Sequence, residues 1–398
     1  MKSSKIKDRV IANTQRSALW VLIGGMLGMM VAMGIGRFAF TPILPLMQRD
    51  LGISNSLAGG LASLNYAGYL AGALICAVWP HVLRYTSVNV TALVASIATT
   101  LLMGFTQSPY WWGALRLVSG VASAMLFVAI AIEVSETMAR SSHSRWSSVL
   151  YGGIGLGIAL SGVSTQILDL LGGWSAAWKG MGGISVILAL VGILMAGKRR
   201  GAISIPDTSS PSKGTLEGVG RLATAYFLEG VGYIVSATFL VTMIAHTPGL
   251  ARFAPWSWVA VGLAAAPSTI FWQQMASRLG VRNALTLAYS IQACGIFLSS
   301  IATRPISTGL AAVIFGGTFL GIVSLVMPEG ARRAGTDGRR AAAILTVCFG
   351  AGQVIGPPLA GLLADQQGDF SLPLILAGSI VVFGGMLVAT DRNFSGAS

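Results

Sequence analysis

Two arginines and one glutamate lie inside apolar runs of this sequence, where charged residues are rare. They are Arg37, Arg116 and Glu229. If such a run crosses a membrane, an arginine near its centre costs about 2.5–3.5 kcal/mol on insertion scales, so a functional role is its first interpretation. Guanidinium groups pair bidentately with carboxylate or phosphate. We therefore expect Arg37 and Arg116 to bind an anionic group of a substrate, or else to brace helices against backbone carbonyls or a buried acid.

Glu229 is suited to a different task. A carboxyl in a low-dielectric environment favours its neutral form, so it can take up and release a proton. We expect Glu229 either to act as a proton-coupling group or to pair with Arg37 or Arg116 across a cavity. A purely structural ion pair is the alternative.

Several uncharged polar residues also interrupt apolar runs. Each is a candidate contact for a substrate, although satisfying a neighbouring helix is the commoner role of such residues. They are Asn65, Tyr69, Tyr233, Thr238 and Gln353.

A second set of acids, Glu133, Glu136 and Glu329, lies near the ends of apolar runs. Basic residues in the adjoining loops can pair with these acids, and we expect such pairs to hold an inner gate shut. The basic candidates are Arg84, Arg145, Arg278, Arg282 and Arg332.

The composition shows which elements must position these residues. The chain has 398 residues, of which 54% are hydrophobic and only 10% charged, whereas a soluble domain carries about 25% charged residues. Apolar runs of about 20 residues, the length that crosses a bilayer, recur throughout. The sequence therefore predicts an all-α polytopic membrane protein embedded in the lipid bilayer. Its net charge of +13 then reflects topology and not nucleic-acid binding.

Short polar breaks divide the chain into twelve predicted spans, an even number that places both termini on one side. Only Arg49, Lys179, Arg252 and Arg304 lie in the alternate, outer loops, so the positive-inside rule predicts cytoplasmic termini. The spans cover residues 18–47, 55–80, 87–107, 109–136, 147–171, 176–197, 219–246, 256–276, 283–303, 305–328, 341–364 and 371–390.

The sequence also divides into two similar halves. A stretch rich in Ser, Pro and Gly predicts a flexible cytoplasmic linker at 198–218, between six-helix bundles at 1–197 and 219–398. Landmarks recur at a nearly constant spacing, which is typical of the internal repeats of secondary transporters. The matching pairs are Gly34 with Gly230, Gly36 with Gly232, Gly120 with Gly316, and Glu133 with Glu329.

Four motifs resemble the major facilitator superfamily. Residues 114–124, ALRLVSGVASA, are similar to its fourth-helix Arg-and-Gly motif, and residues 276–282, ASRLGVR, to its cytoplasmic D-R-x-G-R-R loop. Residues 352–361, GQVIGPPLAG, resemble its Gly/Pro hinge motif. The opening run 34–45, together with 61–74, looks like the bacterial YbfB/YjiJ-type branch.

The resemblance implies two pseudo-symmetric six-helix bundles whose first and fourth helices line a central path. It also implies hinge or packing roles for small residues and one proline, namely Gly157, Gly162, Gly356, Pro357 and Gly361. The chain departs from the pattern in two places. The loop within 72–84 lacks the usual acidic residue, and the fifth span carries glycines but no proline, so the antiporter signature is incomplete.

Motifs for other chemistry are missing from the sequence. There is no phosphate-binding glycine loop, no H-E-x-x-H, no G-x-S-x-G and no paired Cys motif. The histidines (His81, His143, His246) and the cysteines (Cys76, Cys294, Cys348) are scattered. We therefore expect no enzyme activity, no cofactor and no metal site.

The leading hypothesis is a monomeric secondary active transporter in the bacterial inner (plasma) membrane. It would move a small, anionic or amphipathic molecule by alternating access, coupled to protons. A transport-inactive sensor or scaffold with the same fold is the alternative, and it would tolerate loss of Arg37 and Glu229.

Overall fold

Every regular element of the described chain is a helix. The computed structural model describes residues 18–141, 144–196 and 218–394. The predicted N-terminal tail and residues 198–217 of the predicted linker lie outside these ranges. After a helix over residues 18–29, the elements are η1 (Met30–Ile35), α2 (Phe40–Leu51), α3 (Asn55–Val78), η2 (Pro80–Arg84), α4 (Thr86–Leu102), η3 (Met103–Phe105), α5 (Pro109–Arg140), η4 (Ser144–Tyr151), α6 (Gly152–Ala196), α7 (Gly220–His246), η5 (Ala251–Phe253), α8 (Ala254–Leu279), α9 (Val281–Ile301), α10 (Pro305–Ala334), η6 (Gly335–Asp337), α11 (Gly338–Gln367) and α12 (Ser371–Ala389).

Ten segments of the described chain are long and apolar enough to cross a membrane. This differs from the predicted twelve at two places. The segment Trp146–Ala196 contains two predicted spans, and α6 departs from helical geometry inside it at Gly172 and Gly173. The helix α8 matches the predicted span 256–276, but its prolines, serines and tryptophans lower its hydropathy and it is not among the ten. A total of twelve stays a prediction.

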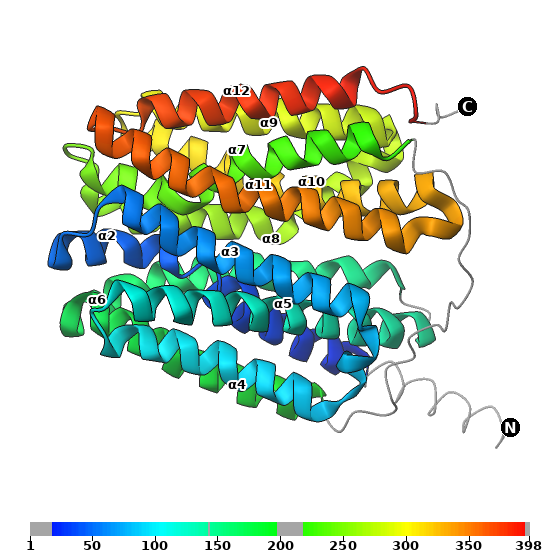
Figure 1. Ribbon diagram of the computed structural model, residues 1–398, viewed down its shortest axis with the longest axis horizontal. Helices are drawn as coiled ribbons and strands as arrows, with labels where there is room; N and C mark the ends of the chain where they lie inside the picture. Colours follow the sequence, from blue (N-terminus) through cyan, green and yellow to red (C-terminus); the bar gives the residue numbers. More distant parts are fainter. Residues whose placement is uncertain (1–17, 142–143, 197–217, 395–398) are drawn as a thin grey trace, which may run out of the picture.

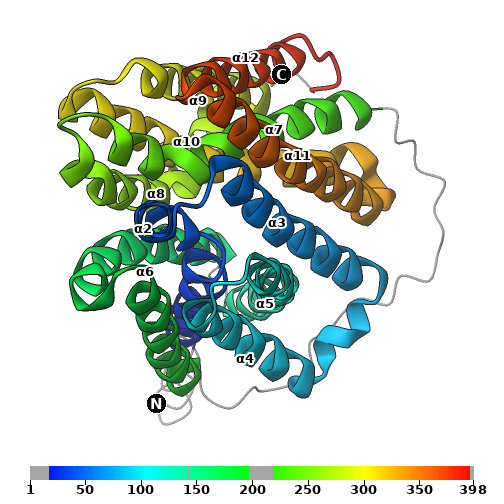
Figure 2. The same cartoon turned by 60° about the vertical axis from the view of Figure 1, so that its left-hand side comes forward.

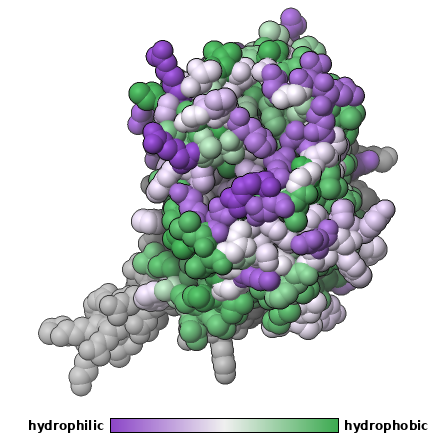
Figure 3. All heavy atoms as spheres, turned by 90° about the vertical axis from the view of Figure 1, so that its left-hand side faces the viewer, coloured by the Kyte–Doolittle hydropathy of each residue, from purple (hydrophilic) through white to green (hydrophobic). Residues whose placement is uncertain are grey.

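The helices run mostly along the long axis of the molecule (Figure 1). Elements up to α6 lie in the lower part of that view, and elements from α7 onward lie in the upper part. The end at which α2 finishes and α3 begins, on the left, is called the predicted outer end. The opposite end, where α12 finishes, is called the predicted inner end. Hydrophilic side chains gather near the middle of the predicted outer face (Figure 3).

Three helix pairs make the main contacts between the two parts of the molecule. The helix α3 packs against α11, α6 packs against α8, and α2 packs against α7. Figure 2 shows α3 running beside α11. Because these pairs bring together segments far apart in the sequence, side chains of α2 and α3 reach those of α7 and α11.

Small residues permit close packing within each part. A Cβ added at Gly157 of α6 would lie 2.8 Å from the Cα of Gly34 in η1. A Cβ added at Gly356 of α11 would lie 2.7 Å from the carbonyl oxygen of Val231 in α7. Both distances are too short for a side chain, so glycine lets the two backbones of each pair touch.

The other predicted packing residues lie where the two parts meet. A Cβ at Gly162 would lie 3.0 Å from the side chain of Val259 in α8. In α11, Gly361 faces the backbone of Asn55, and the Pro357 carbonyl faces Gly59 of α3. The structure thus places these residues at helix contacts, whereas a hinge role for them stays a prediction.

Candidate functional site

The first predicted span is not a continuous α-helix, because its backbone changes geometry just before Arg37. The π-helix η1 is followed by a turn and then by α2. The Gly36 amide donates to the Val31 carbonyl at 2.9 Å, a wider turn than that of an α-helix. Single π-helical turns occur frequently at functional sites. Here the irregular turn lies between packed helices, where non-helical backbone inside a membrane protein is tolerated.

Arg37 is 3% exposed and reaches across to the other part of the molecule. Its Nη2 donates to Oε1 of Gln353 in α11 at 2.8 Å. Gln353 in turn donates through Nε2 to the hydroxyl of Tyr233 in α7. The guanidinium also lies 4.8 and 4.4 Å from the ring centroids of Tyr66 and Tyr69 in α3. Four of the predicted site residues, Arg37, Tyr69, Tyr233 and Gln353, are therefore together in space.

Arg116 faces the backbone of the same turn. Its Nη1 and Nη2 lie 3.5 Å from the Gly36 carbonyl oxygen and 3.4 Å from the Arg37 carbonyl oxygen. Ser119 donates to the Gly36 carbonyl at 3.0 Å, and Asn65 donates to the Arg116 carbonyl at 3.0 Å. Arg116 and Arg37 thus lie at the same depth, as their positions along the spans predict. The geometry of Arg116 is that of the bracing alternative, and a substrate contact by Arg116 stays a prediction.

Neither buried guanidinium has an acidic partner in the part of the chain that the structure describes. Among the described residues no ion pair includes Arg37 or Arg116. The Nε of each is also buried without a hydrogen-bond partner. A charge removed from water costs several kcal/mol unless an opposite charge compensates it. The site is therefore a buried, uncompensated positive region, which an anion would stabilise.

Further polar contacts between the two parts surround Arg37. The Thr41 hydroxyl donates to the Ala237 carbonyl at 2.6 Å. The hydroxyls of Tyr66 and Thr238 lie 3.3 Å apart. Thr238, one of the sequence candidates, therefore contacts the opposing helix, as the structural alternative for these residues describes.

Glu229 lies apart from the arginines. It is 1% exposed, and its Oε1 accepts a hydrogen bond from Nε2 of Gln292 in α9 at 2.7 Å. Its Oε2 has no partner. Within the part of the chain that the structure describes, no ion pair joins Glu229 to Arg37 or Arg116, so the expected pairing is not observed. The reason is that the Glu229 carboxyl meets α9, whereas Arg37 meets α3 and α11.

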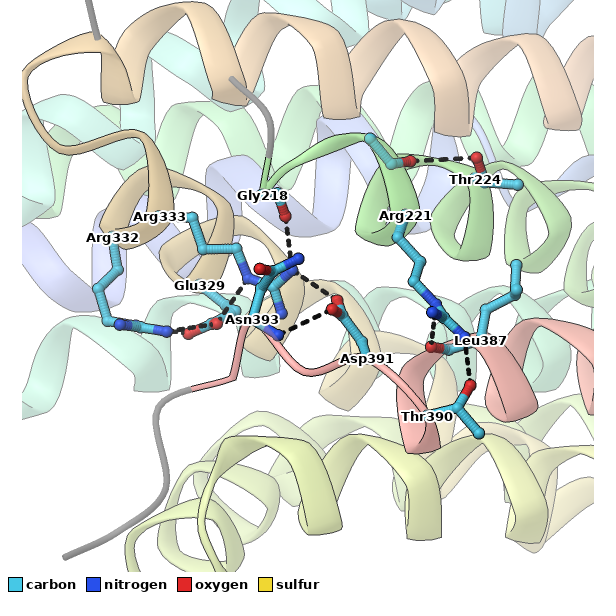
Figure 4. Close-up of polar contacts among 11 residues, drawn as sticks. Gly218, Arg221, Thr224, Glu329, Arg332, Arg333, Leu387, Thr390, Asp391 and Asn393 are labelled. Atoms are coloured by element: carbon cyan, nitrogen blue, oxygen red, sulfur yellow. Dashed lines mark hydrogen bonds and ion pairs between the residues drawn. The ribbon is translucent and has the colours of Figure 1, made fainter. Parts of the chain in front are cut away.

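Glu329 forms the gate-type ion pairs that the sequence predicts, but within one part of the molecule. Arg332, one of the expected partners, donates to Glu329 at 2.7 Å, and Arg333 donates to it at 2.8 Å. Arg333 also pairs with Asp391 at 2.7 Å and donates to the Gly218 carbonyl at 2.7 Å (Figure 4). This network joins α10 to the segments at both ends of the described 218–394 range.

Among the remaining gate candidates, Glu136 has its ion-pair partner on its own helix. Glu136 pairs with Arg140 one turn away at 3.0 Å. Arg278 and Arg282 are exposed, and no ion pair in the described chain includes them. Arg84 ends η2 and Glu133 lies in α5. The side chain of Arg145 lies outside the description. A gating role for this set stays a prediction.

A carboxylate that the sequence analysis passed over joins the two parts at the predicted outer end. Asp365 of α11 accepts hydrogen bonds from the backbone amides of Asn55 and Ser56 at 3.0 and 2.8 Å, and from the Ser56 hydroxyl. These amides begin α3, where unpaired N–H groups attract negative charge. Its sequence context, a polar break after the predicted span 341–364, gave no sign of a partner 310 residues away.

Two other missed features need tertiary structure to be seen. Gln292 is the hydrogen-bond partner of Glu229, and Asp391 is the partner of Arg333. The Arg333–Glu329 pair could have been found, because residues four apart share a helix face. Among the described residues, no group of three His, Cys, Asp or Glu side chains is arranged to hold a metal ion.

Comparison with known proteins identifies the family. Residues 29–389 match the family model described as "Uncharacterised MFS-type transporter YbfB". The chain is 26% identical over 227 residues to the uncharacterized MFS-type transporter YceJ of Bacillus subtilis, covering 54% of this chain and 56% of that protein. It is 24% identical over 167 residues to a gentisate transporter of Corynebacterium glutamicum, covering 42% of this chain and 37% of that protein. It thus spans about half the length of the first relative and less of the second.

A third relative and a solved structure match over most of the chain. A chloramphenicol efflux pump of Mycobacterium tuberculosis is 24% identical over 372 residues, covering 86% of this chain and 84% of that protein. The nucleoside transporter NupG has a similar fold, with a TM-score of 0.68 and 13% identity, covering 94% of this chain and 98% of that one. At this identity the likeness concerns the fold alone. The family match over nearly the whole chain decides the assignment: the protein belongs to the YbfB-type family of major facilitator superfamily transporters.

Proposed function

We propose that the protein is a secondary active transporter that moves a small organic anion, with the anion bound at Arg37. Family membership supports membrane transport of a small molecule. The relatives named for gentisate and chloramphenicol support an organic substrate. The observation that carries the proposal is the buried guanidinium of Arg37, which has a neutral amide as its only side-chain hydrogen-bond partner within the described residues.

The position of Arg37 suits alternating access. It lies on the first span, contacts the rings of α3, and binds Gln353 of α11. If the predicted bundles 1–197 and 219–398 rock about this point, the Arg37–Gln353 distance changes with each swing. An anion held between them is then exposed first to one side and then to the other.

The membrane placement is part of the same proposal. Basic residues concentrate in the loops of the predicted inner end, so the positive-inside rule places both termini in the cytoplasm of a bacterial cell, with the protein in the inner membrane. The first described helix begins and α12 finishes at the same end of the molecule (Figure 1), which agrees with an even number of spans.

Proton coupling is assigned to Glu229. It is the buried acid of α7, and it has one unpartnered oxygen and no cation paired with it among the described residues. Burial without a counter-charge favours the neutral carboxyl, so ionisation of Glu229 requires that its surroundings change during the transport cycle. Such a group binds a proton in one conformation and releases it in another.

The direct test is uptake into liposomes that contain the purified protein. Benzoate, cyclohexanecarboxylate and hexanoate are supplied with and without a pH gradient. We expect faster uptake of at least one carboxylate than into empty liposomes. Arg37→Gln should reduce uptake to the empty-liposome rate, and Arg37→Lys should reduce it partly because the bidentate fork is lost. Arg252→Gln, which removes an exposed arginine, is the matched control.

The outcomes separate the hypotheses. Undiminished uptake by the Arg37→Gln protein would exclude Arg37 as the anion site. Carboxylate uptake that is absent in every condition would favour the transport-inactive sensor or scaffold. For coupling, Glu229→Gln should keep carboxylate exchange but lose the response to the pH gradient, whereas Asp369→Asn, which neutralises an exposed acid and serves as the control, should keep both. A gradient response that survives Glu229→Gln would remove Glu229 from the coupling role.

A further inference from the structure

Five aromatic rings near Arg37 lie in nearly parallel planes. They are called the ring stack and comprise Tyr226 and Tyr233 of α7, Phe315 and Phe319 of α10, and Phe349 of α11. The Phe349 centroid lies 4.2 Å from that of Tyr226 and 5.3 Å from that of Tyr233, with interplanar angles of 10° and 5°. Tyr233 and Phe319 are 6.0 Å apart at 8°. Phe315 lies at 17° to Tyr233 and at 12° to Phe319.

This arrangement is local to the site. In the described chain every ring pair with an interplanar angle below 30° belongs to the ring stack. Pairs elsewhere are steeper, such as Trp112 with Trp174 at 82° and Phe239 with Phe370 at 36°. Packing of helices alone therefore does not impose parallel rings on this protein.

The ring stack adjoins Arg37 through α11. Phe349 and Gln353 are four residues apart, so their side chains share one face of α11 about one helical turn, 5.4 Å, apart. Gln353 binds the Arg37 guanidinium on one side and the Tyr233 hydroxyl on the other. A ligand whose acidic group takes the place of Gln353 at Arg37 thus has ring faces within one turn of that group.

Aromatic rings from the part of the molecule that precedes α7 also lie near Arg37. Tyr69 of α3 lies 4.4 Å from the Arg37 guanidinium and contacts Phe127 of α5 at 6.5 Å. Phe38 contacts Phe319 of the ring stack at 6.2 Å. Tyr69 and Phe349 are both partly exposed, whereas Tyr226 and Tyr233 are buried. Two aromatic residues beside Arg37, one from each part, are therefore incompletely covered by protein.

We propose that the anion bound at Arg37 is an aromatic monocarboxylate, whose ring packs against Phe349 and Tyr69 while its carboxylate replaces Gln353 as the acceptor for Arg37. This inference rests on the proposed function and names its substrate class. A carboxylate forms roughly twice as strong a hydrogen bond with a guanidinium as a neutral acceptor does, so the exchange of partners is favourable. The partly exposed rings of Phe349 and Tyr69 offer an aryl group the offset-stacked or edge-to-face contacts that it prefers.

The test compares two anions of equal charge and similar size. Binding of benzoate and of cyclohexanecarboxylate to the purified protein in lipid nanodiscs is measured by titration calorimetry. The saturated ring is the more hydrophobic, so burial alone favours cyclohexanecarboxylate. Stacking reverses the order, and we expect benzoate to bind about tenfold more tightly. Benzamide, which keeps the ring and lacks the charge, should bind at least about tenfold more weakly than benzoate.

Variants of Phe349 test whether this residue causes the preference for benzoate over cyclohexanecarboxylate. Phe349→Leu should abolish the difference between the two anions, whereas Phe349→Tyr keeps a ring and should retain it. Phe383→Leu, which removes an exposed ring of α12 far along the chain from the site, is the control and should change neither affinity. If Phe349→Leu does not fold, the Phe349→Tyr protein and the wild-type comparison still decide the question.

The outcomes distinguish failure of the aromatic substrate class from failure of the organic-anion function. Equal affinities for the two anions, both lost in Arg37→Gln, would overturn the aromatic class and leave the organic-anion function standing. The same holds for a benzoate preference that survives Phe349→Leu, since the ring stack would then not cause it. Absence of any Arg37-dependent carboxylate binding would overturn both proposals.

Discussion

Arg37 and Arg333 both have buried side chains and lie in opposite electrostatic surroundings. Arg37 is 3% exposed and so is the Arg333 side chain. Arg333 pairs with Glu329 and Asp391, binds a backbone carbonyl, and covers the Phe394 ring at 4.1 Å. Arg37 has one neutral amide and the faces of aromatic rings.

The difference separates a charge that stabilises the fold from a charge that is available to bind a ligand. A buried cation with two carboxylates is compensated, so its removal leaves two buried acids with less positive charge beside them. A buried cation without a carboxylate can still gain favourable electrostatic energy by binding an anion. The first arrangement stabilises the fold at the predicted inner end (Figure 4). The second leaves a position for a ligand between the two parts of the molecule.

The largest expected effect comes from replacing each arginine by methionine. Arg333→Met should lower the free energy of unfolding by about 3–5 kcal/mol, because Asp391 loses its ion-pair partner and Glu329 loses one of two. Arg37→Met should leave stability unchanged or raise it, because it removes an uncompensated charge. The midpoint of heat-induced loss of monodisperse protein in detergent measures both. A comparable loss for Arg37→Met would show that Arg37 is structural and would end the comparison.

Giving Arg37 a carboxylate of its own would make it resemble Arg333. Gln353→Glu places an acid 2.8 Å from the guanidinium if the side chain keeps its position. We expect a higher thermal midpoint and at least about a tenfold loss of benzoate affinity, because the internal carboxylate competes with the ligand. Gln292→Glu, another buried glutamine exchange, is the matched control for benzoate binding. Retained affinity in Gln353→Glu would mean that the anion does not occupy the position of Gln353.

Asp365 tests a third arrangement, in which a carboxylate of one part accepts hydrogen bonds from backbone amides of the other part. Asp365→Asn should weaken the contact with the start of α3 by about 1 kcal/mol, the usual scale of a helix N-terminal interaction. Distances between spin labels placed on α3 and α11 at the predicted outer end should then broaden toward longer values. Asp369→Asn, four residues further along, serves as the control. An unchanged distance distribution would show that packing alone holds this end together.

The exposed pair of Glu136 with Arg140 should have the smallest effect. The Arg140 side chain is 59% exposed, so solvent screens the interaction. Glu136→Gln should therefore change the free energy of unfolding by less than about 0.5 kcal/mol. A shift of several degrees in the thermal midpoint would mean that Glu136 has a further partner in another conformation, as the gate hypothesis requires.

Family, helical class and most helix positions could be predicted from the sequence, because the length and hydropathy of a membrane span are local properties. Most of the predicted spans correspond to helices whose ends differ by a few residues. The break before Arg37 could not be predicted in this way. Residues 18–51 are apolar enough to form one span, whereas the irregular turn is accompanied by contacts of Arg116 and Ser119 with its backbone carbonyls.

The sequence by itself determined which residue types stand in apolar surroundings, and it singled out Arg37, Glu229, Tyr233 and Gln353 one by one. Tertiary structure alone decided which of them meet. Arg37 and Gln353 are 316 residues apart, whereas Glu136 and Arg140 are four apart and share a helix face. Helical periodicity fixes neighbours within one or two turns, but contacts between distant helices depend on how their surfaces pack, which no local pattern encodes.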